Sequence, residues 1–317
     1  MKKFIFFLFI LFISCYFYKN YNYFKFYYIK QEVKDVINEI NENKKILENI
    51  KNKIQQADDG KKEILEFIDV PKKSNIDDYT VYNDVTSRHK YPFGDSAGRH
   101  INVHETAHGI HSDLRNEYQK KLKYKCNTFY CLKGKAVVLR EPKITIKDVT
   151  KYIPPNLRSY RYQLYFVDQI KNWNDMPTYI LDEWTAYILG SMCAVEDYEK
   201  GLQKPVSDAV SGCLDFSIYS IAMAMAVKDL EPNYWIENPN LREFIKFNLQ
   251  RAENTFLLGK DAFRSSKQDK LLNSFLNEKE SDNLRNFMRN EFGDYFLKQK
   301  CGEAYMEEEF KIDFTFE

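Results

Sequence analysis

The sequence His104-Glu105-Thr106-Ala107-His108 spaces two histidines four residues apart and places a glutamate directly after the first. The surrounding pattern predicts a helix that runs to about Leu122. Residues four apart lie one above the other on a helix, so both imidazole rings could present a nitrogen to one tetrahedral metal ion. Glu105 lies beside this pair, where its carboxylate could act as a general base on a water held by the metal.

All five histidines of the 317-residue chain lie between His89 and His111, which favours a metal site over a chance occurrence of the motif. With so few histidines, the pattern is expected by accident in fewer than about one chain in fifty. The competing interpretation is that the two histidines only pack on the inner face of a helix. The apolar neighbours Val103, Ala107 and Ile110 indicate a helix packed into a domain, and zinc is the ion that we expect.

A catalytic zinc site needs a third protein ligand and an open fourth position. His100 and His111 share the predicted helix but lie too far along its axis, since His111 is about 10 Å from His104. A second predicted helix, at residues 179–189, is apolar on nearly all sides. A carboxylate buried there needs a compensating partner, and Glu183, with its long side chain, is the expected third ligand.

The acidic pair Asp182-Glu183 also has an explanation that needs no metal. Either carboxylate could form an ion pair with Arg158 or Arg161 upstream. The position of Glu183 relative to the two imidazole rings therefore distinguishes a metal centre from a salt bridge.

The His-Glu-x-x-His helix and the later glutamate resemble the gluzincin class of zinc metallopeptidases, whose third ligand comes from a downstream helix. The resemblance covers residues 104–108 and the segment around Glu183. It implies a zincin-like fold and peptide-bond hydrolysis. It also implies that His104, His108 and Glu183 are the zinc ligands and that Glu105 is the general base.

The chain departs from that class at one position. In many gluzincins an acidic residue four positions after the ligand glutamate steadies the first histidine, whereas this chain has Tyr187 there. Asp182 and Asp168 are the candidates for that supporting role.

Between the two predicted helices, residues 129–132 and 135–140 have the pattern of short strands around Lys133-Gly134. This pattern predicts a β-hairpin. An exposed strand of such a hairpin could hold a substrate backbone through ladder hydrogen bonds.

The chain has no histidine after His111, so a side-chain donor to a developing oxyanion must be tyrosine or arginine. Tyr160 and Tyr162, which follow a Pro154-Pro155 loop, are the candidate catalytic tyrosines. Packing is the alternative role for both, because the chain has 23 tyrosines.

The N-terminus places Lys2 and Lys3 before an apolar run over residues 4–18, which is the pattern of a signal peptide. Aromatic residues continue to Ile29, so residues 1–30 could also remain as a membrane anchor. The segment around Cys15 resembles a bacterial lipoprotein signal, in which this cysteine carries the lipid. We therefore expect an extracytoplasmic protein that is attached to a membrane by this segment, or is secreted.

Residues 31–70 predict a helical stalk, because apolar residues recur every seven positions among Lys, Glu and Asn: Val33, Ile40, Leu47 and Ile54. Three to four heptads give marginal coiled-coil stability, so a weak coiled-coil dimer and a solvated single helix are both open. A spacer between anchor and domain is the simplest role for this segment.

The composition excludes several classes of protein. The 47 basic and 46 acidic side chains nearly cancel, so no broad positive field indicates a nucleic-acid partner. Six cysteines are too few for a disulfide scaffold. Outside the cytosol, Cys126 could pair with Cys131, and Cys193 with Cys213; four buried free thiols are the alternative.

These features predict a mainly α (α+β) fold, with a zincin-like helical domain and a small β-hairpin or sheet. The metallopeptidase domain is expected at residues 75–200, with residues 201–317 as a C-terminal helical part that packs on it. The expected activity is zinc-dependent hydrolysis of protein or cell-wall peptide. The alternatives are a non-catalytic zinc-binding module and a stalked membrane adaptor whose histidines merely pack.

Overall fold

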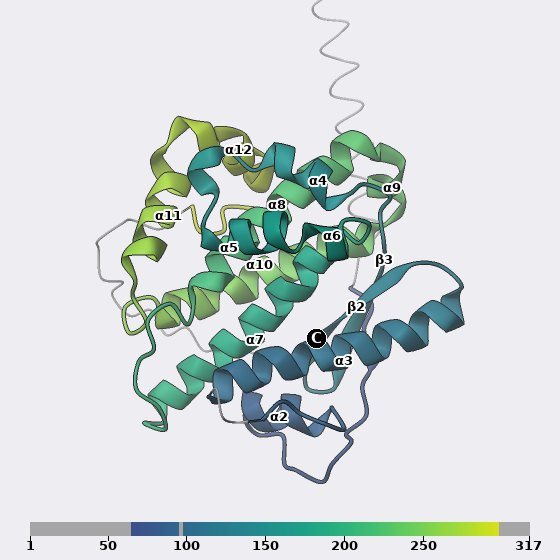
Figure 1. The fold of residues 1–317 in the computed structure, drawn as a ribbon, viewed down its shortest axis with the longest axis vertical. Helices are drawn as coiled ribbons and strands as arrows, with labels where there is room; N and C mark the ends of the chain where they lie inside the picture. The colour runs from purple at the N-terminus through teal and green to yellow at the C-terminus, as the bar shows by residue number, and fades with distance from the viewer. Residues whose placement is uncertain (1–64, 95–97, 298–317) are drawn as a thin grey trace, which may run out of the picture. The chain divides into compact units, whose positions relative to one another are not determined.

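The computed structural model of the protein describes residues 65–94 and 98–297 (Figure 1). The predicted signal or anchor at residues 1–30 lies outside the described residues, as does most of the predicted stalk. None of the described helices combines the length and the hydropathy that a bilayer span requires.

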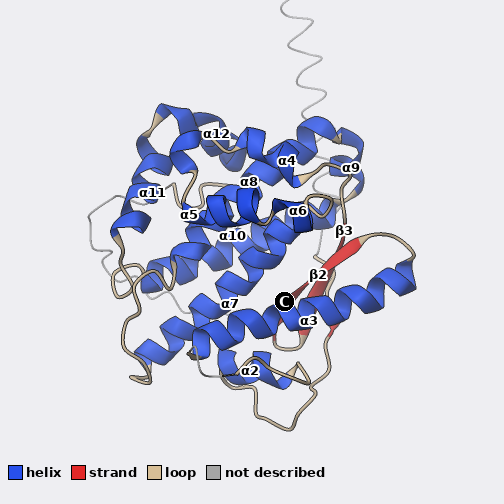
Figure 2. Ribbon diagram, in the orientation of Figure 1, coloured by secondary structure: helices blue, strands red, loops and turns tan. Residues whose placement is uncertain are grey.

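The described part of the chain is mainly helical, as predicted, with one small sheet (Figure 2). In chain order, its helices are α2 (Val81–Ser87), α3 (Arg99–Leu122), α4 (Ile146–Val149), α5 (Tyr160–Tyr162), α6 (Ile170–Trp173), α7 (Tyr179–Glu199), α8 (Ser211–Leu230), α9 (Pro232–Glu237), α10 (Pro239–Gly259), α11 (Ser266–Asn277) and α12 (Asp282–Glu291). A π-helical segment, Gln163–Asp168, follows α5 directly and leads to α6. Short 3-10 turns lie at Thr150–Tyr152, Pro155–Leu157 and Lys279–Ser281.

The sheet has three antiparallel strands, β1 (Ile68–Asp69), β2 (Cys126–Leu132) and β3 (Lys135–Arg140), in the order β1-β3-β2. The predicted hairpin is confirmed, although β2 begins three residues before residue 129. Its turn needs left-handed backbone at Gly134 (φ 69°), which glycine adopts without a steric cost.

The stalk prediction is wrong at its C-terminal end. Residues 65–70 are not helical, and Ile68 pairs instead with Ala136 of β3. The heptad pattern ends at Ile54, and the described apolar residues Leu65, Phe67 and Ile68 pack on the domain: the Phe67 ring lies 5.8 Å from that of Phe247. Burial of these side chains in the core therefore replaces a continuing helix.

One hydrophobic core joins the helices around α7. This helix packs against α3, α8, α10 and β2, and its Trp184 is fully buried. Phe216 of α8 and Phe244 of α10 belong to the same core. The boundary predicted at residue 200 lies between α7 and α8, two helices that share this core, and the C-terminal helices pack on the rest of the domain through it.

Of the two alternatives for the cysteines, the structure has the buried free thiols: Cys126, Cys131, Cys193 and Cys213 are all free and buried. Cys126 and Cys131 lie on the same strand, so about five residue steps of roughly 3.3 Å separate them. A disulfide needs Cα atoms within about 7 Å of each other.

Candidate metal centre

The helix predicted around the histidine motif is confirmed as α3, which brings His104 and His108 to the face that contacts α7. Their Nε2 atoms lie 3.2 Å apart. Glu183, in the second turn of α7, points its Oε2 atom at both rings, at 3.7 Å from His104 Nε2 and 3.5 Å from His108 Nε2. The three residues predicted as ligands therefore converge on one point.

These separations fit a tetrahedral zinc ion. Metal–ligand bonds of about 2.0–2.1 Å place the ligand atoms of such an ion about 3.3 Å from one another. Glu183 is only 3% exposed, and its Oε2 atom is buried without a hydrogen-bond partner among the described residues. A buried carboxylate oxygen is costly without a partner, and a cation at the convergence point would supply one.

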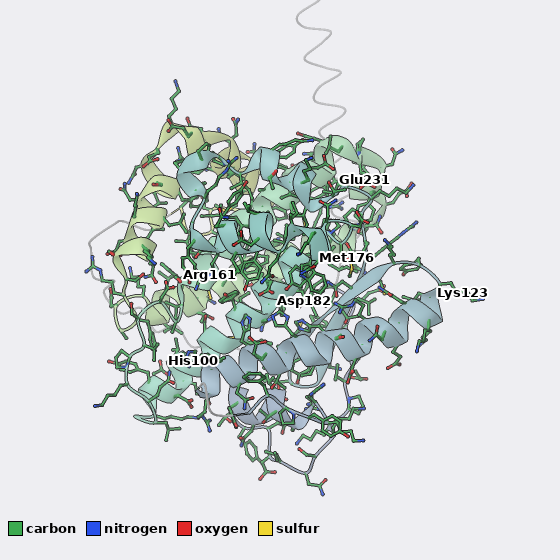
Figure 3. All side chains as sticks on the ribbon, viewed as in Figure 1. His100, Lys123, Arg161, Met176, Asp182 and Glu231 are labelled. Atoms are coloured by element: carbon green, nitrogen blue, oxygen red, sulfur yellow. The ribbon has the colours of Figure 1, made fainter. Side chains whose placement is uncertain are left out.

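Asp182, on α7 where this helix passes α3 (Figure 3), contacts this cluster through His108. Its Oδ1 atom accepts hydrogen bonds from His108 Nδ1 at 2.6 Å and from His111 Nδ1 at 2.9 Å. Arg115 Nη1 lies 3.4 Å from Oδ2. A carboxylate on the second ring nitrogen of a ligand histidine fixes its tautomer and orientation. Asp182 thus contacts the second histidine of the motif and holds His111 outside the ligand cluster.

The other supporting candidate, Asp168, is not at the site, because it accepts a hydrogen bond from Gln163 on the surface. The salt-bridge alternative for the acidic pair is also wrong. Arg161 pairs with Asp215 at 2.8 Å, and Arg158 donates to the Ile153 carbonyl. Both arginines are therefore committed to other partners.

The electrostatics of the cluster favour one neutral and one charged imidazole in the absence of metal. Burial, together with the positive charge of His108, lowers the pKa of His104 to about 3. Burial also opposes the charge on His108, but Asp182 and Glu183 outweigh it and raise the pKa of His108 well above its usual value. His104 is therefore held in the neutral form that a metal requires.

Glu105 lies at the edge of the cluster, exposed to solvent. With His104, Arg161, Tyr165 and Tyr187 it lines a cavity of about 310 Å³ between α3 and α7. This position leaves the Glu105 carboxylate accessible to a ligand in the cavity. On α3, the two histidines predicted as ligands are thus partly buried, and the glutamate predicted as the base is exposed.

The structure does not bring the two predicted catalytic tyrosines to the ligand cluster. The Tyr160 hydroxyl donates to Asp208 at 2.7 Å. The Tyr162 ring stacks on Phe166, with centroids 5.3 Å apart. Both side chains are engaged in local packing, which was the alternative role considered for them.

Three other tyrosines lie at the cluster instead. Tyr179 donates a hydrogen bond to Glu183 Oε1, and the Tyr187 ring lies 4.5 Å from that of His104. The Tyr165 hydroxyl lies 3.2 Å from that of Tyr187. Burial and the negative charge of Glu183 raise the pKa of Tyr165, so this hydroxyl stays protonated as a donor.

Helical spacing could have identified two of these tyrosines. Tyr179 and Tyr187 lie four residues before and after Glu183, so the three share one face of α7. Tyr165 carries no such signal, because the π-helical segment positions it. Single π turns of this kind are frequent at functional sites.

The hairpin does not offer the free strand expected for substrate binding. Every residue of β2 is buried, and α3 covers the strand. Thr128 Oγ1 donates to the His111 carbonyl, and Gln119 Nε2 donates to the Cys126 carbonyl. A substrate backbone would have to displace these contacts.

We found no family model, no curated protein and no solved structure that matches this chain.

Proposed function

We propose that the chain is a zinc-dependent peptidase in which His104, His108 and Glu183 hold the ion and Glu105 is the general base. The observation that carries the proposal is the buried Glu183 Oε2 atom, which faces two imidazole nitrogens and has no other partner among the described residues. A metal centre accounts for this arrangement, whereas without an ion the oxygen has only its ion pairs with the two rings, at 3.5 and 3.7 Å, and no hydrogen bond among the described residues.

When bound, zinc lowers the pKa of a water ligand to near 7 and polarises a carbonyl group. Glu105 takes the proton of the attacking water and returns it to the leaving amine. Asp182 holds the His108 ring in its ligand orientation throughout. Tyr165, as a protonated hydroxyl beside the cluster, is the side chain best placed to donate to the developing oxyanion.

Peptide bonds are the favoured substrate because one exposed carboxylate can both accept a proton and deliver it to an amine. The cavity beside Glu105 has room for a substrate side chain. A protein or a cell-wall peptide outside the cytosol is the substrate class that we propose. Attachment to a membrane through residues 1–30 remains part of this proposal, with secretion as its alternative.

The test compares two matched variants of the full chain, Glu105→Gln and Glu117→Gln, which make the same change on the same helix. Wild type and both variants should bind one zinc per chain, measured by metal analysis of the purified protein. Peptide-library cleavage should fall by about 10²- to 10⁴-fold in Glu105→Gln, as expected for loss of a general base, and stay unchanged in Glu117→Gln.

Two results would contradict the proposal. Stoichiometric zinc without cleavage by the wild type would identify a non-catalytic zinc-binding module. Purified protein without zinc, and without uptake of added zinc, would leave the histidines as packing residues and favour a membrane adaptor.

A further inference from the structure

The end of α3 opposite the metal centre carries exposed cations that the peptidase proposal does not use. Figure 3 shows Lys123 at this end and His100 at the other. We define the basic end by its six exposed side chains, which come from α3, from the loop after it, and from the end of β3 and the loop that follows: Lys120, Lys121, Lys123, Lys125, Arg140 and Lys143. Lys123 lies about 28 Å along the helix axis from His104.

None of these six cations forms an ion pair with a carboxylate of the described residues. Although other exposed lysines do not, five lysines elsewhere on the domain do so: Lys72, Lys135, Lys151, Lys200 and Lys228. The acidic side chains near them are Glu117, one turn back on α3, and Asp175 and the buried Glu141, which line the same hollow as Lys125 and Lys143. Because three acids do not balance six cations, the basic end keeps a net positive charge.

An exposed tyrosine lies at the centre of the basic end. Tyr124 is 42% exposed, and the Arg140 guanidinium lies over its ring at 5.5 Å. Tyr124, Lys125, Arg140 and Lys143 line a hollow of about 350 Å³. Tyrosine beside lysine and arginine is the combination that concentrates at the interface between lipid headgroups and water.

The first described residues lead into β1, an edge strand of the sheet beside β3. β1 is antiparallel to β3, with Asp69 opposite Lys135 and Ile68 opposite Ala136. Extended backwards along this register, the described residues 65–67 run towards the end of β3 that carries Arg140. The apolar segment that we expect at the membrane lies upstream on the same chain.

We propose that the basic end docks on an anionic lipid bilayer, with Tyr124 at the headgroup level. This inference goes beyond the peptidase proposal and does not depend on zinc. Each lysine or arginine near an anionic surface strengthens binding by about fivefold, so six unpaired cations form a substantial electrostatic contact. The near-zero net charge of the whole chain and its N-terminal apolar run favour a membrane over a nucleic acid.

The test places a photoreactive benzophenone side chain at position 124 of the full chain. The protein is reconstituted into vesicles of phosphatidylcholine alone or with about one third phosphatidylglycerol. We expect crosslinking to lipid in the anionic vesicles, at several times the yield in neutral ones and reduced by high salt. The combined change Lys121→Gln, Lys123→Gln and Lys125→Gln should lower the yield to the neutral-vesicle level.

Two matched controls make the result specific. A benzophenone at Tyr79, which is 88% exposed beside Asp78 and Asp84, should not crosslink to lipid. The triple change Lys72→Gln, Lys151→Gln and Lys200→Gln, at paired lysines, should leave crosslinking at position 124 unchanged. Equal yields at positions 79 and 124, or no dependence on anionic lipid, would overturn the proposal. Crosslinking of position 124 to an added RNA oligonucleotide in preference to lipid would also overturn it.

Discussion

At the scale of single residues, Asp182 is the group on which most of the candidate site depends. One buried carboxylate receives two imidazole donors and lies near Arg115. Burial would raise its pKa, but the histidines outweigh this effect and lower it, so Asp182 stays ionised. It therefore orients His108 and stabilises any positive charge that the ring carries.

Changing Asp182 to asparagine should weaken zinc binding by about 10- to 100-fold, because the amide supports the His108 ring less firmly than a carboxylate does. The affinity is measured by competition with a chromophoric chelator. Asp168→Asn is the matched control, since Asp168 lies on the surface and bonds to Gln163. Equal zinc affinities for the two variants would show that Asp182 does not support a metal ligand.

The sequence predicted which candidate ligands lie close together better than it predicted their surroundings. His104, His108 and Glu183 follow from helical spacing and from the cost of burying a carboxylate. Tyr160 and Tyr162 do not lie at the cluster, because a π-helical turn, rather than a regular period, decides which of the hydroxyls near residue 160 reaches it. Tyr165 could therefore not be chosen over its neighbours from spacing alone.

At the scale of secondary-structure elements, the site depends on how closely α3 and α7 approach. Gly190 lies at their contact, where an added Cβ would meet the His100 carbonyl oxygen at 2.8 Å and His104 Cβ at 3.4 Å. Both neighbours belong to α3, and one of them is backbone. The absence of a side chain at Gly190 thus allows α3 and α7 to approach each other closely.

Gly190→Ala should destabilise the protein by about 1–3 kcal/mol, because the helices must separate to admit the methyl group. Gly109→Ala on α3 is the matched control, since there the added Cβ meets the tip of the His89 side chain, which can rotate away. Both changes gain the same helix propensity, so the difference in free energy of unfolding between the two variants reports the cost at the contact between α3 and α7. Urea unfolding measures it, and equal stabilities for the two variants would contradict the close approach.

The start of α7 is held by a buried acid that the sequence did not single out. Glu141, 6% exposed, accepts hydrogen bonds from the backbone nitrogen and the hydroxyl of Thr178. Burial raises the pKa of Glu141 to about 7, above its model-peptide value of 4.5. Nothing in the local pattern around Glu141 signals this contact, because its partner lies 37 residues away.

Stability should therefore fall as pH rises from about 4.5 to about 7, because the folded state holds the Glu141 proton more tightly than the unfolded state does. Glu141→Gln removes this dependence. Relative to wild type, the free energy of unfolding of the variant should rise by up to about 3 kcal/mol between pH 4.5 and pH 7.5. Urea unfolding at both pH values checks this, and a constant difference between the two proteins would show that Glu141 ionises normally.

At the scale of the whole molecule, α3 and α7 are long helices that share one core with α8 and α10. Helical periodicity correctly predicted the existence of these helices, but not their packing partners. The predicted boundary at residue 200 falls between two helices of one core, since periodicity does not show that two apolar faces meet. The nearly complete burial of α8 is the property that places it at the centre.

A cation between α3 and α7 would join two of these central helices, so its removal should lower the stability of the domain as a whole. Zinc present at 100 times its dissociation constant raises the free energy of unfolding by about 2.7 kcal/mol. For a domain of this size, that corresponds to a fall in Tm of about 5–10 °C when a chelator such as dipicolinate removes the ion. Differential scanning calorimetry measures the shift.

His104→Gln should start from the lower Tm and show no response to chelator, whereas His89→Gln, outside the ligand cluster, should respond as the wild type does. If the Tm of the wild type is the same with and without chelator, no metal joins the two helices.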